Sequence, residues 1–249
     1  MEFIILLFVL LGGLLLYMLY LGFGNNILRH QITASGIPEK KRIFFISDTH
    51  NRTISNKVIE RIRGEVDWII IGGDFADKRT SFHKLEENLK RLTSVAPTFF
   101  IWGNNDEEVG EQAIVELFKR YGVTIVANDS NLLTDESNVI RLCAVHFHES
   151  ERKIEKSLRY CQPKDAIIYV AHNPEVFPSV LRQIKPLLLL GGHLHGGQIR
   201  LGRFGMFSNG SFTKQDGVHT LISNGYGTTL VPLRLGAKAQ THIIEITFE

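Results

Sequence analysis

Five short apolar segments of this chain each lead directly into side chains that can bind a metal ion. The polar groups that follow them are Asp48-Thr49-His50, Gly73-Asp74, Gly103-Asn104-Asn105-Asp106, His172-Asn173 and Gly192-His193-Leu194-His195. Short runs rich in β-branched and aromatic residues are typical of buried strands. Because ligands of α/β sheets bind outside the carboxyl ends of the strands, we expect these polar side chains to meet in one crevice.

The spacing of apolar residues along the rest of the chain predicts further strands and helices. The expected strands are Ile43–Ile46, Trp68–Ile71, Phe99–Trp102, Val123–Val126, Val139–Val145, Ala166–Val170, Leu187–Leu190, Thr220–Ile222 and Thr241–Phe248. Apolar residues three and four positions apart predict helices at Ser55–Arg63, Phe82–Leu92, Glu111–Tyr121, Glu151–Tyr160 and Glu175–Ile184. This order predicts a layered α/β sandwich, in which two sheets pack on each other and helices lie outside.

The chain begins with a long apolar segment. Phe3–Phe23 holds 21 residues without a charged or strongly polar side chain, enough for a helix to cross a hydrocarbon core of ~30 Å. A cleaved signal peptide is the alternative, and it would give a secreted protein. The run is longer than the apolar part of a signal peptide and follows Glu2 rather than a basic residue, which favours an uncleaved transmembrane anchor.

The flanking charges predict the orientation of this anchor. Basic side chains follow the apolar run, at Arg29, Lys40, Lys41 and Arg42. The positive-inside bias then predicts a single-pass protein of the cell membrane with its folded domain in the cytoplasm. We divide the chain into an anchor at residues 1–24, a tether at 25–41 and a folded domain at 42–249, because the middle segment is polar and lacks periodicity.

The overall composition excludes two other classes of protein. The 28 basic and 26 acidic side chains give a net charge of +2, which is too small to create a strong field for DNA or RNA. The two cysteines, Cys143 and Cys161, are too few for a disulfide framework in a chain of 249 residues. Free thiols are expected, although the spacing leaves a single disulfide open.

The polar groups at the strand ends resemble the motif set of the calcineurin-like metallophosphoesterases. The matching residues are Asp48-Thr49-His50, Gly73-Asp74, Gly103-Asn104, His172 and Gly192-His193-Leu194-His195, and the resemblance covers roughly Ile43 to Phe248. The segments Gly192–Ile199 and Asn224-Gly225-Tyr226-Gly227 are similar to the subgroup of this family that is tethered to membranes. One such motif often occurs by chance, but five in the same order at strand ends rarely do.

The resemblance implies a site for two divalent metal ions. By position, the first ion would be held by Asp48, His50 and His195, the second by Asn104, His172 and His193, and Asp74 would bridge them. Carboxylate and imidazole ligands together suit Mn, Fe or Zn. Two such ions can activate water and neutralise phosphoryl charge, so the implied reaction is hydrolysis of a phosphate ester or phosphoanhydride.

Asn105 departs from the family pattern. Enzymes of this family usually carry a histidine here that protonates or stabilises the leaving group, and an amide donates no titratable proton. In the first interpretation the leaving group is already a stable anion, as with a phosphoanhydride. In the second, His146 or His148 takes the place of the missing histidine, and in the third catalysis is lost or much reduced. Asp106 is expected to orient Asn105 or an ion-bound water, or to be a solvated loop residue.

The predicted function is therefore a membrane-anchored phosphoesterase: a phosphodiesterase, phosphomonoesterase or pyrophosphatase. Its predicted partners are a phosphorylated small molecule or a lipid-linked substrate, and the membrane itself. The alternative, suggested by Asn105, is a non-catalytic, metal-containing membrane interaction module. A small apolar group in a late loop, formed by Phe204, Met206 and Phe207, is expected to be buried rather than to contact an acyl chain.

Overall fold

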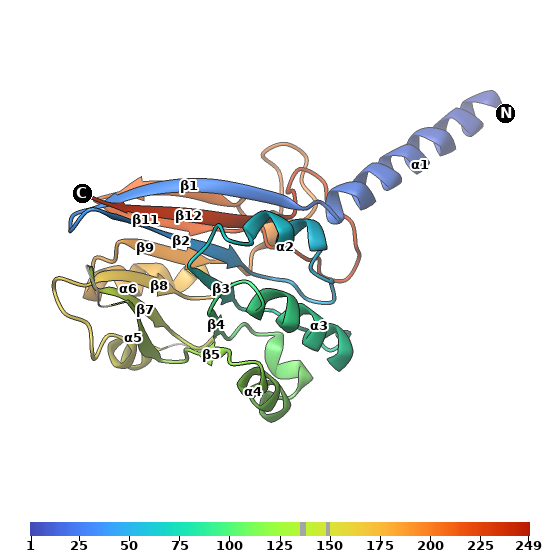
Figure 1. The fold of residues 1–249 in the computed structure, drawn as a ribbon. Helices are drawn as coiled ribbons and strands as arrows, with labels where there is room; N and C mark the ends of the chain where they lie inside the picture. The colour runs from blue at the N-terminus through green and yellow to red at the C-terminus, as the bar shows by residue number, and fades with distance from the viewer. Residues whose placement is uncertain (135–137, 148–149) are drawn as a thin grey trace.

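The computed structural model describes residues 1–134, 138–147 and 150–249 (Figure 1). The helices are α1 (Glu2–Gly22), α2 (Asn56–Ile62), α3 (Phe82–Thr93), α4 (Glu111–Arg120), α5 (Glu151–Ser157) and α6 (Phe177–Gln183), with short 3-10 turns η1 (Asp106–Val109), η2 (Pro174–Val176) and η3 (His195–Gly197). The strands are β1 (Asn26–Ala34), β2 (Glu39–Ile46), β3 (Trp68–Gly72), β4 (Thr98–Ile101), β5 (Thr124–Ile125), β6 (Asp129–Thr134), β7 (Ile140–Ala144), β8 (Ala166–Val170), β9 (Leu188–Gly191), β10 (Ser211–Gln215), β11 (Val218–Ile222) and β12 (Gln240–Phe248).

Two six-stranded sheets pack face to face, as the sequence pattern predicts. Their strand orders are β1-β12-β2-β3-β4-β5 and β10-β11-β9-β8-β7-β6. Inward side chains of both sheets form a shared apolar layer, which includes Phe45 and Ile70 from the first sheet and Ile168 and Leu190 from the second. Helices α2, α3 and α4 cover the outer face of the first sheet, and α5 and α6 cover that of the second. The fold is thus a two-sheet α/β sandwich.

The direction of the strands determines where the polar groups at their ends meet. Strands β2, β3, β4 and β5 run parallel, as do β7, β8, β9 and β11. Their central residues are buried on both faces, which explains why they are apolar runs without alternation. Because both sheets present carboxyl ends at the same end of the sandwich, the residues that follow β2, β3, β4, β8 and β9 come together there.

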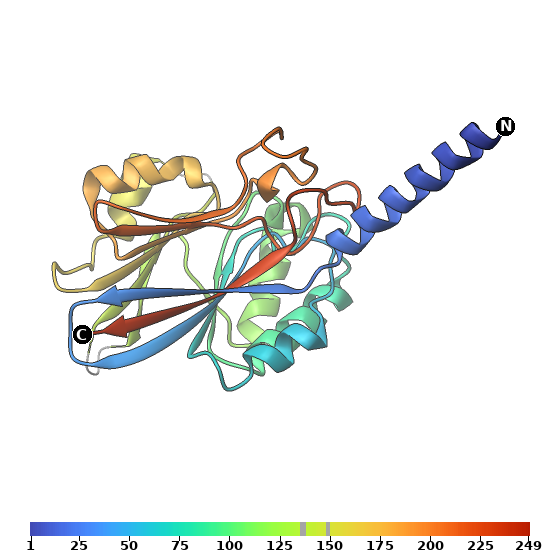
Figure 2. The same ribbon diagram turned by 90° about the horizontal axis from the view of Figure 1, so that it is seen from above.

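The segment that the sequence predicts as a tether belongs to the folded domain instead. Nine of its residues form β1, which pairs in parallel with β12 from Asn26↔Gln240 to Ala34↔Phe248 (Figure 2). The strand lies at a sheet edge and most of its side chains are partly or fully exposed, so its sequence lacks a clear alternation. Backbone pairing rather than side-chain pattern places it, and Ile32 is the residue that enters the core.

Helix α1 projects away from the domain and meets it at its C-terminal end (Figures 1 and 2). By length and composition it can cross a membrane, a property that signal sequences share. Its last residues, Leu21 and Gly22, are buried against the domain. The guanidinium of Arg52 donates to the carbonyl oxygens of Gly22, Phe23 and Gly24, so the connection between α1 and β1 is held firmly.

The two cysteines lie side by side in the second half of the chain. Cys143 is in β7 and Cys161 follows α5, and both are free thiols. Their Sγ atoms are 3.2 Å apart.

The burial of Ile32 gives a direct test of the position of β1. We expect Ile32→Ala to lower the free energy of unfolding by about 2–4 kcal/mol, because it leaves a cavity between the sheets. The matched control is Leu28→Ala on the same strand, where the side chain is 41% exposed and the change should stay within about 0.5 kcal/mol. Denaturant unfolding of both variants in one detergent measures the difference, and equal free energies would contradict a structural role for β1.

Candidate metal centre

Six of the seven side chains predicted to bind metal form two clusters at the carboxyl ends of the strands. The first consists of Asp48, His50 and His195, and the second of Asp74, His172 and His193. Within each cluster the candidate ligand atoms lie within 4.8 Å of one another. The clusters draw on loops that follow β2, β3, β8 and β9, so residues from both sheets build one centre.

The two clusters adjoin each other. In the first, the Nε2 atoms of His50 and His195 are 3.0 Å apart. In the second, Nε2 of His172 lies 3.3 Å from Oδ2 of Asp74. The same carboxylate oxygen is 3.8 Å from Nε2 of His50, which belongs to the first cluster. Asp74 therefore lies between the two sets of candidate ligands.

Five of these ligand candidates share an uncommon backbone conformation. Asp48, His50, Asp74, His193 and His195 have φ angles between 48° and 69°, in the left-handed region. This conformation costs roughly 1–2 kcal/mol for a residue with a side chain. Such residues cluster at functional sites, where the surrounding fold holds them in place. Here the left-handed turn directs each side chain into the crevice immediately after its strand ends.

Two glycines permit the close packing of the loops. A Cβ atom on Gly103 would collide with the backbone nitrogen and the carboxylate of Asp74. A Cβ atom on Gly192 would collide with the carboxylate of Asp48 and the hydroxyl of Ser47. Glycine is therefore required where the strand exits approach the two aspartates.

Asp106 fixes the loops that carry the ligands. Its carboxylate is fully buried and accepts hydrogen bonds from the backbone N–H groups of Asp74, Ala76 and Gly103. Burial, and after it the charge of Asp74, raises the pKa of Asp106 to about 7. Asp106 thus joins the exits of β3 and β4. It is neither a solvated loop residue nor bonded to the side chain of Asn105 by any hydrogen bond in the described structure.

Asp77 supports His50, a role that was not predicted from the sequence. Its Oδ2 lies 3.3 Å from Nδ1 of His50, and Arg79 donates to the same carboxylate. Burial opposes ionisation of Asp77, but its contacts with His50 and Arg79 outweigh this and lower the pKa of Asp77 well below its usual range. A carboxylate behind a metal-binding imidazole orients the ring and raises its basicity. Nothing in the spacing of Asp77 separates it from an ordinary loop aspartate.

Arg234 supports His195, which follows strand β9 of the second sheet, and this role was not predicted from the sequence either. Its guanidinium is fully buried, lies 3.3 Å from Nδ1 of His195 and donates to the carbonyl oxygens of Asn224 and Gly227. Burial lowers the pKa of Arg234 to about 10. Its sequence position indicates no such role, because a late loop arginine is most often a surface residue.

The donor atoms in the centre fit divalent metal ions. Oδ1 of Asn104 and Nε2 of His172 are buried and have no hydrogen-bond partner in the described part of the chain. Nδ1 of His172 lies 2.8 Å from the carbonyl oxygen of Gly72, so its proton is used there and Nε2 faces the crevice. Burial lowers the pKa of His172, but the Asp74 carboxylate outweighs this and raises it to about 10.

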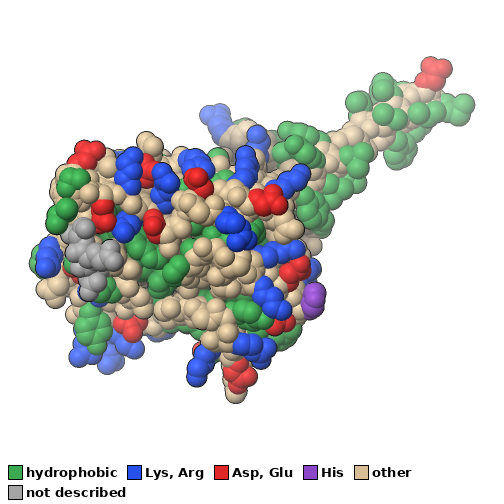
Figure 3. Space-filling view, viewed as in Figure 1, with side chains coloured by type: hydrophobic (Ala, Val, Ile, Leu, Met, Phe, Trp, Pro, Cys, Tyr) green, Lys and Arg blue, Asp and Glu red, His purple; other side chains and the backbone are tan. Residues whose placement is uncertain are grey.

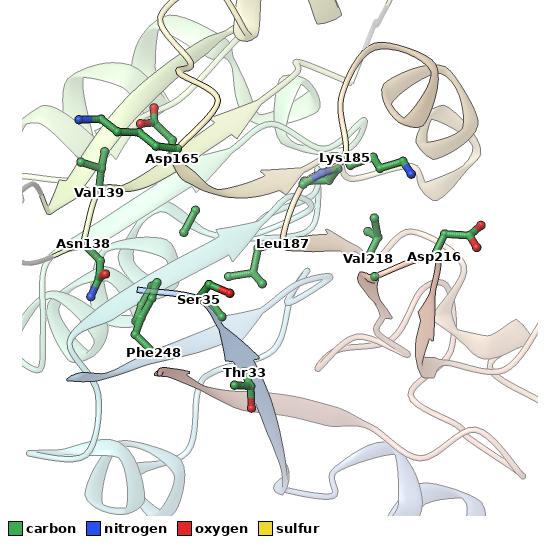
Figure 4. A pocket seen from close by; sticks show the side chains of 15 residues that line it. Thr33, Ser35, Asn138, Val139, Asp165, Lys185, Leu187, Asp216, Val218 and Phe248 are labelled. Carbon is green, nitrogen blue, oxygen red and sulfur yellow. The ribbon is translucent and has the colours of Figure 1, made fainter. Parts of the chain in front are cut away.

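Four of the seven candidate ligands line a pocket of about 280 Å³ that opens to the surface. These four are Asp74, Asn104, His193 and His195, and the lining also includes Met206 and Phe207. The prediction that Phe204, Met206 and Phe207 are buried is wrong, because their side chains are 71%, 83% and 46% exposed. A separate hollow between Thr33, Asp165 and Asp216 lies at the opposite end of the sandwich and contains none of these ligands (Figure 4).

Comparison with known families agrees with this centre. Residues 42–200, which include all seven predicted ligands, match the model of the calcineurin-like phosphoesterase superfamily domain. The chain belongs to the calcineurin-like phosphoesterases.

Several bacterial proteins are similar to this calcineurin-like chain over most of its length. The uncharacterized protein YpbG of Bacillus subtilis is 37% identical, over 90% of this chain and 88% of the relative. Phosphodiesterase YaeI of Escherichia coli is 28% identical, over 64% of this chain and 62% of the relative. An uncharacterized metallophosphoesterase of Helicobacter pylori is 26% identical over 88% of this chain, which spans 64% of that protein.

Solved structures share the calcineurin-like fold at low sequence identity. A 5'-nucleotidase precursor from Thermus thermophilus superposes with a TM-score of 0.53 and 13% identity. The match covers 84% of this chain and 55% of that one, so the shared part is about half of the nucleotidase.

Asn105, the departure from the calcineurin-like pattern, positions its neighbour. Its Oδ1 accepts a hydrogen bond from the side-chain amide of Asn104 at 2.9 Å, and its backbone N–H donates to Oδ1 of Asp74. The first contact uses the amide nitrogen of Asn104, while the amide oxygen of Asn104 is buried and has no hydrogen-bond partner in the described part of the chain. Asn105 also lines the pocket.

Of the two histidines predicted as substitutes for the missing one, only His146 lies among the described residues. The ring of His146 stacks on Trp102, and its Nε2 lies 3.4 Å from the carboxylate of Glu107. His148 lies outside the described residues. Between them, the ring of Phe147 contacts those of His172 and His193, with centroids 6.2 and 5.6 Å away. Phe147 thus provides an apolar neighbour for the second cluster.

The role of Asp77 can be tested through metal affinity. We expect Asp77→Asn to weaken metal binding by about 10–100-fold, because the neutral amide no longer fixes and polarises the His50 imidazole. Asp216→Asn is the matched control, since Asp216 is exposed and lies in the turn after β10. Competition with a chromogenic chelator measures the affinity of both variants. Equal affinities, with both variants folded by circular dichroism, would rule out this role.

Proposed function

We propose that this protein is a metal-dependent phosphoric ester hydrolase that acts on a phosphodiester or phosphoanhydride. The observation that carries the proposal is the pair of adjoining candidate ligand clusters, each of which contributes at least one side chain to the lining of one open pocket. The donor set of three oxygen-bearing and four imidazole side chains suits two ions of Mn, Fe or Zn. When bound, such ions supply a water of lowered pKa and offset the charge of the phosphoryl oxygens.

The side chains of the chain itself act by holding and orienting the groups around the phosphoryl centre. Asp74 lies between the clusters, and the buried supports Asp77, Asp106 and Arg234 keep the ligands in place. Phe147 and Phe207 border the ligands with apolar surface, which reduces access of bulk water. Reduced access strengthens the electrostatic interactions within the pocket.

The amide at position 105 favours a substrate with a good leaving group. Asn105 lines the pocket but offers no titratable proton, and Nε2 of His146 is engaged close to Glu107. A phosphoanhydride, or an ester of an acidic alcohol, leaves as a stable anion and needs no general acid. The name of the Escherichia coli relative, a phosphodiesterase, further supports starting with diesters and anhydrides.

Restoring the histidine tests this choice of substrate. We expect Asn105→His to raise turnover of a dialkyl phosphodiester by about tenfold or more, because a positioned general acid assists a poor leaving group. Turnover of a nitrophenyl phosphodiester should change little in the same variant. Both assays use the full chain with added Mn²⁺, and the Asp74→Asn variant gives the background from contaminating enzymes.

Two further outcomes separate the competing interpretations. Unchanged rates in both His146→Ala and His148→Ala would remove these histidines as substitutes for the general acid. Bound metal without turnover of any ester or anhydride would favour the non-catalytic membrane interaction module over the hydrolase.

We further propose that α1 is retained as a membrane anchor. Its C-terminal end is part of the packed structure, since Gly22 is buried against Pro232 and the backbone N–H of Arg234 donates to the carbonyl oxygen of Met18. Removing α1 as a signal peptide would uncover these contacts. The basic residues that follow the helix support a cytoplasmic domain.

Membrane fractionation tests the anchor. We expect the full-length chain to remain in the membrane pellet after extraction at alkaline pH and to be released by detergent, because a spanning helix is held by the hydrocarbon core. A shorter chain in the soluble or secreted fraction would indicate cleavage and support the secreted hydrolase instead.

A further inference from the structure

Two loops beside the metal pocket expose large apolar side chains to solvent. Leu201, Phe204 and Met206 are 72%, 71% and 83% exposed in the first loop, which follows η3. Leu230 is 90% exposed in the second loop, which connects β11 to β12. Soluble surfaces rarely gather such residues, and a contiguous group of them marks an interaction site. We call these two loops, residues 198–207 and 228–235, the apolar rim.

Hydrogen bonds join the two loops into one body. The side chain of Gln198 donates to the carbonyl oxygens of Thr229 and Val231 and accepts from the N–H of Thr229. The guanidinium of Arg200 donates to the carbonyl oxygens of Gly196 and Arg203, which closes the first loop on itself. The exposure of the apolar side chains is therefore a feature of a braced structure.

The apolar rim is attached directly to the end of α1. Arg234, at the end of the second loop, is hydrogen-bonded through its N–H to the carbonyl oxygen of Met18. Gly22 packs so closely on Pro232 that a Cβ atom would collide with the carbonyl oxygen of Pro232. Both views of the ribbon place these loops on the side of the domain from which α1 projects (Figures 1 and 2). Hydrophobic side chains cover α1 and continue to its junction with the domain (Figure 3).

The charges in this region are of one sign. The chain carries 26 acidic residues, yet none occurs between positions 196 and 215 or between 224 and 238. Of the basic residues in these stretches, Arg203 and Lys238 are exposed, whereas Arg200 and Arg234 are buried and Lys214 lies on β10 towards the opposite end of the sandwich. Arg203 is exposed and lies over the ring of Phe204, and Lys238 is exposed beside the end of α1. Apolar side chains interleaved with basic ones are typical of surfaces that bind an anionic leaflet.

We propose that the apolar rim inserts into the membrane leaflet next to α1 and presents the metal pocket to phosphoryl groups at the level of the lipid headgroups. The distance between anchor and domain permits this arrangement, because only Phe23, Gly24 and Asn25 separate α1 from β1 and Arg52 binds all three. A domain held this close to the end of a spanning helix keeps the surrounding loops at the bilayer surface.

This position also defines a class of substrate, and here the inference rests on the proposed hydrolase function. Met206 and Phe207 belong both to the apolar rim and to the wall of the metal pocket. A substrate whose phosphoryl group lies on the pocket floor can extend an apolar chain along this wall into the leaflet. The chemistry that fits is an amphipathic phosphodiester or diphosphate with a lipid tail.

Fluorescence quenching by brominated lipid tests the insertion without reference to activity. The full chain carrying Phe204→Trp is reconstituted into vesicles of phosphatidylcholine and phosphatidylglycerol with brominated acyl chains. A side chain buried about 5–10 Å into the headgroup boundary approaches the bromine atoms, so we expect about a twofold loss of the added emission. Tyr160→Trp is the matched control, because Tyr160 is an exposed aromatic residue between α5 and β8. It therefore precedes the amino end of a parallel strand, whereas the metal pocket lies at the carboxyl ends. Its emission should be the same with and without bromine.

A second measurement addresses the substrate. We expect the double variant Phe204→Asp, Leu230→Asp to lose about tenfold or more of its turnover of a lipid-linked diphosphate in vesicles, because two apolar side chains no longer enter the leaflet. Turnover of a soluble nitrophenyl phosphodiester should be unchanged, since neither residue lines the metal pocket.

The outcomes distinguish failure of the docking proposal from failure of the hydrolase proposal. Equal emission from Phe204→Trp in brominated and ordinary vesicles overturns the docking surface, and concentration-dependent dimers of the same sample would assign the rim to a second copy of the chain. An equal loss on both substrates in the double variant overturns the link to lipid substrates. If Phe204→Trp is quenched but the unsubstituted chain turns over neither substrate, the docking surface stands and the hydrolase proposal is overturned.

Discussion

The metal centre depends on the polypeptide turning sharply at the point where each buried strand ends. Five ligand candidates adopt left-handed backbone angles immediately after a strand, and the turns bring short side chains from two sheets to one point. This conformation is unfavourable by itself, so the rest of the fold must hold it. Glycine at 103 and 192 lets the strand exits come within contact of Asp74 and Asp48, where any side chain would collide. The shape of the centre is thus determined by backbone packing before any ion is considered.

Buried charged groups outside the ligand set hold these turns in place. Asp106 accepts three backbone N–H groups from two loops, and Arg234 donates to carbonyl oxygens of the segment that follows β11. A buried charge is costly unless its hydrogen bonds are satisfied, and both groups meet that condition. Removing either side chain would leave several buried backbone groups unpaired, and each unpaired group would lower the free energy of unfolding by about 1–3 kcal/mol. The ligands therefore depend on side chains that never face the substrate.

The sequence predicted the sheets and the clusters well because both follow from local pattern. Parallel strands buried on two faces read as apolar runs, and a ligand at the end of each run needs only the topology to meet its partners. The strand β1 could not be recognised in this way, because it is an exposed edge strand placed by backbone pairing with β12 across more than 200 residues. Asp77 and Arg234 were missed for a related reason. Asp77 lies 3.3 Å from His50 and Arg234 lies 3.3 Å from His195, and both pairs are far apart in the sequence. Residue type alone predicts neither the burial of these side chains nor their contacts.

The exposed loops show how an apparent conflict with folding rules can carry functional information. A chain that buried Phe204 and Met206 would satisfy the usual preference of apolar residues for the core, yet both are exposed while Arg200 beside them is buried. This inversion is maintained by hydrogen bonds from Gln198 and Arg200 to carbonyl oxygens, so the fold supports the exposed state rather than merely tolerating it. The same loops border the metal pocket on one side and the end of α1 on the other. Helix α1, the apolar rim and the pocket beside the candidate ligands are therefore connected, and exposed apolar side chains such as those of the rim are stable in contact with lipid and unfavourable in contact with water.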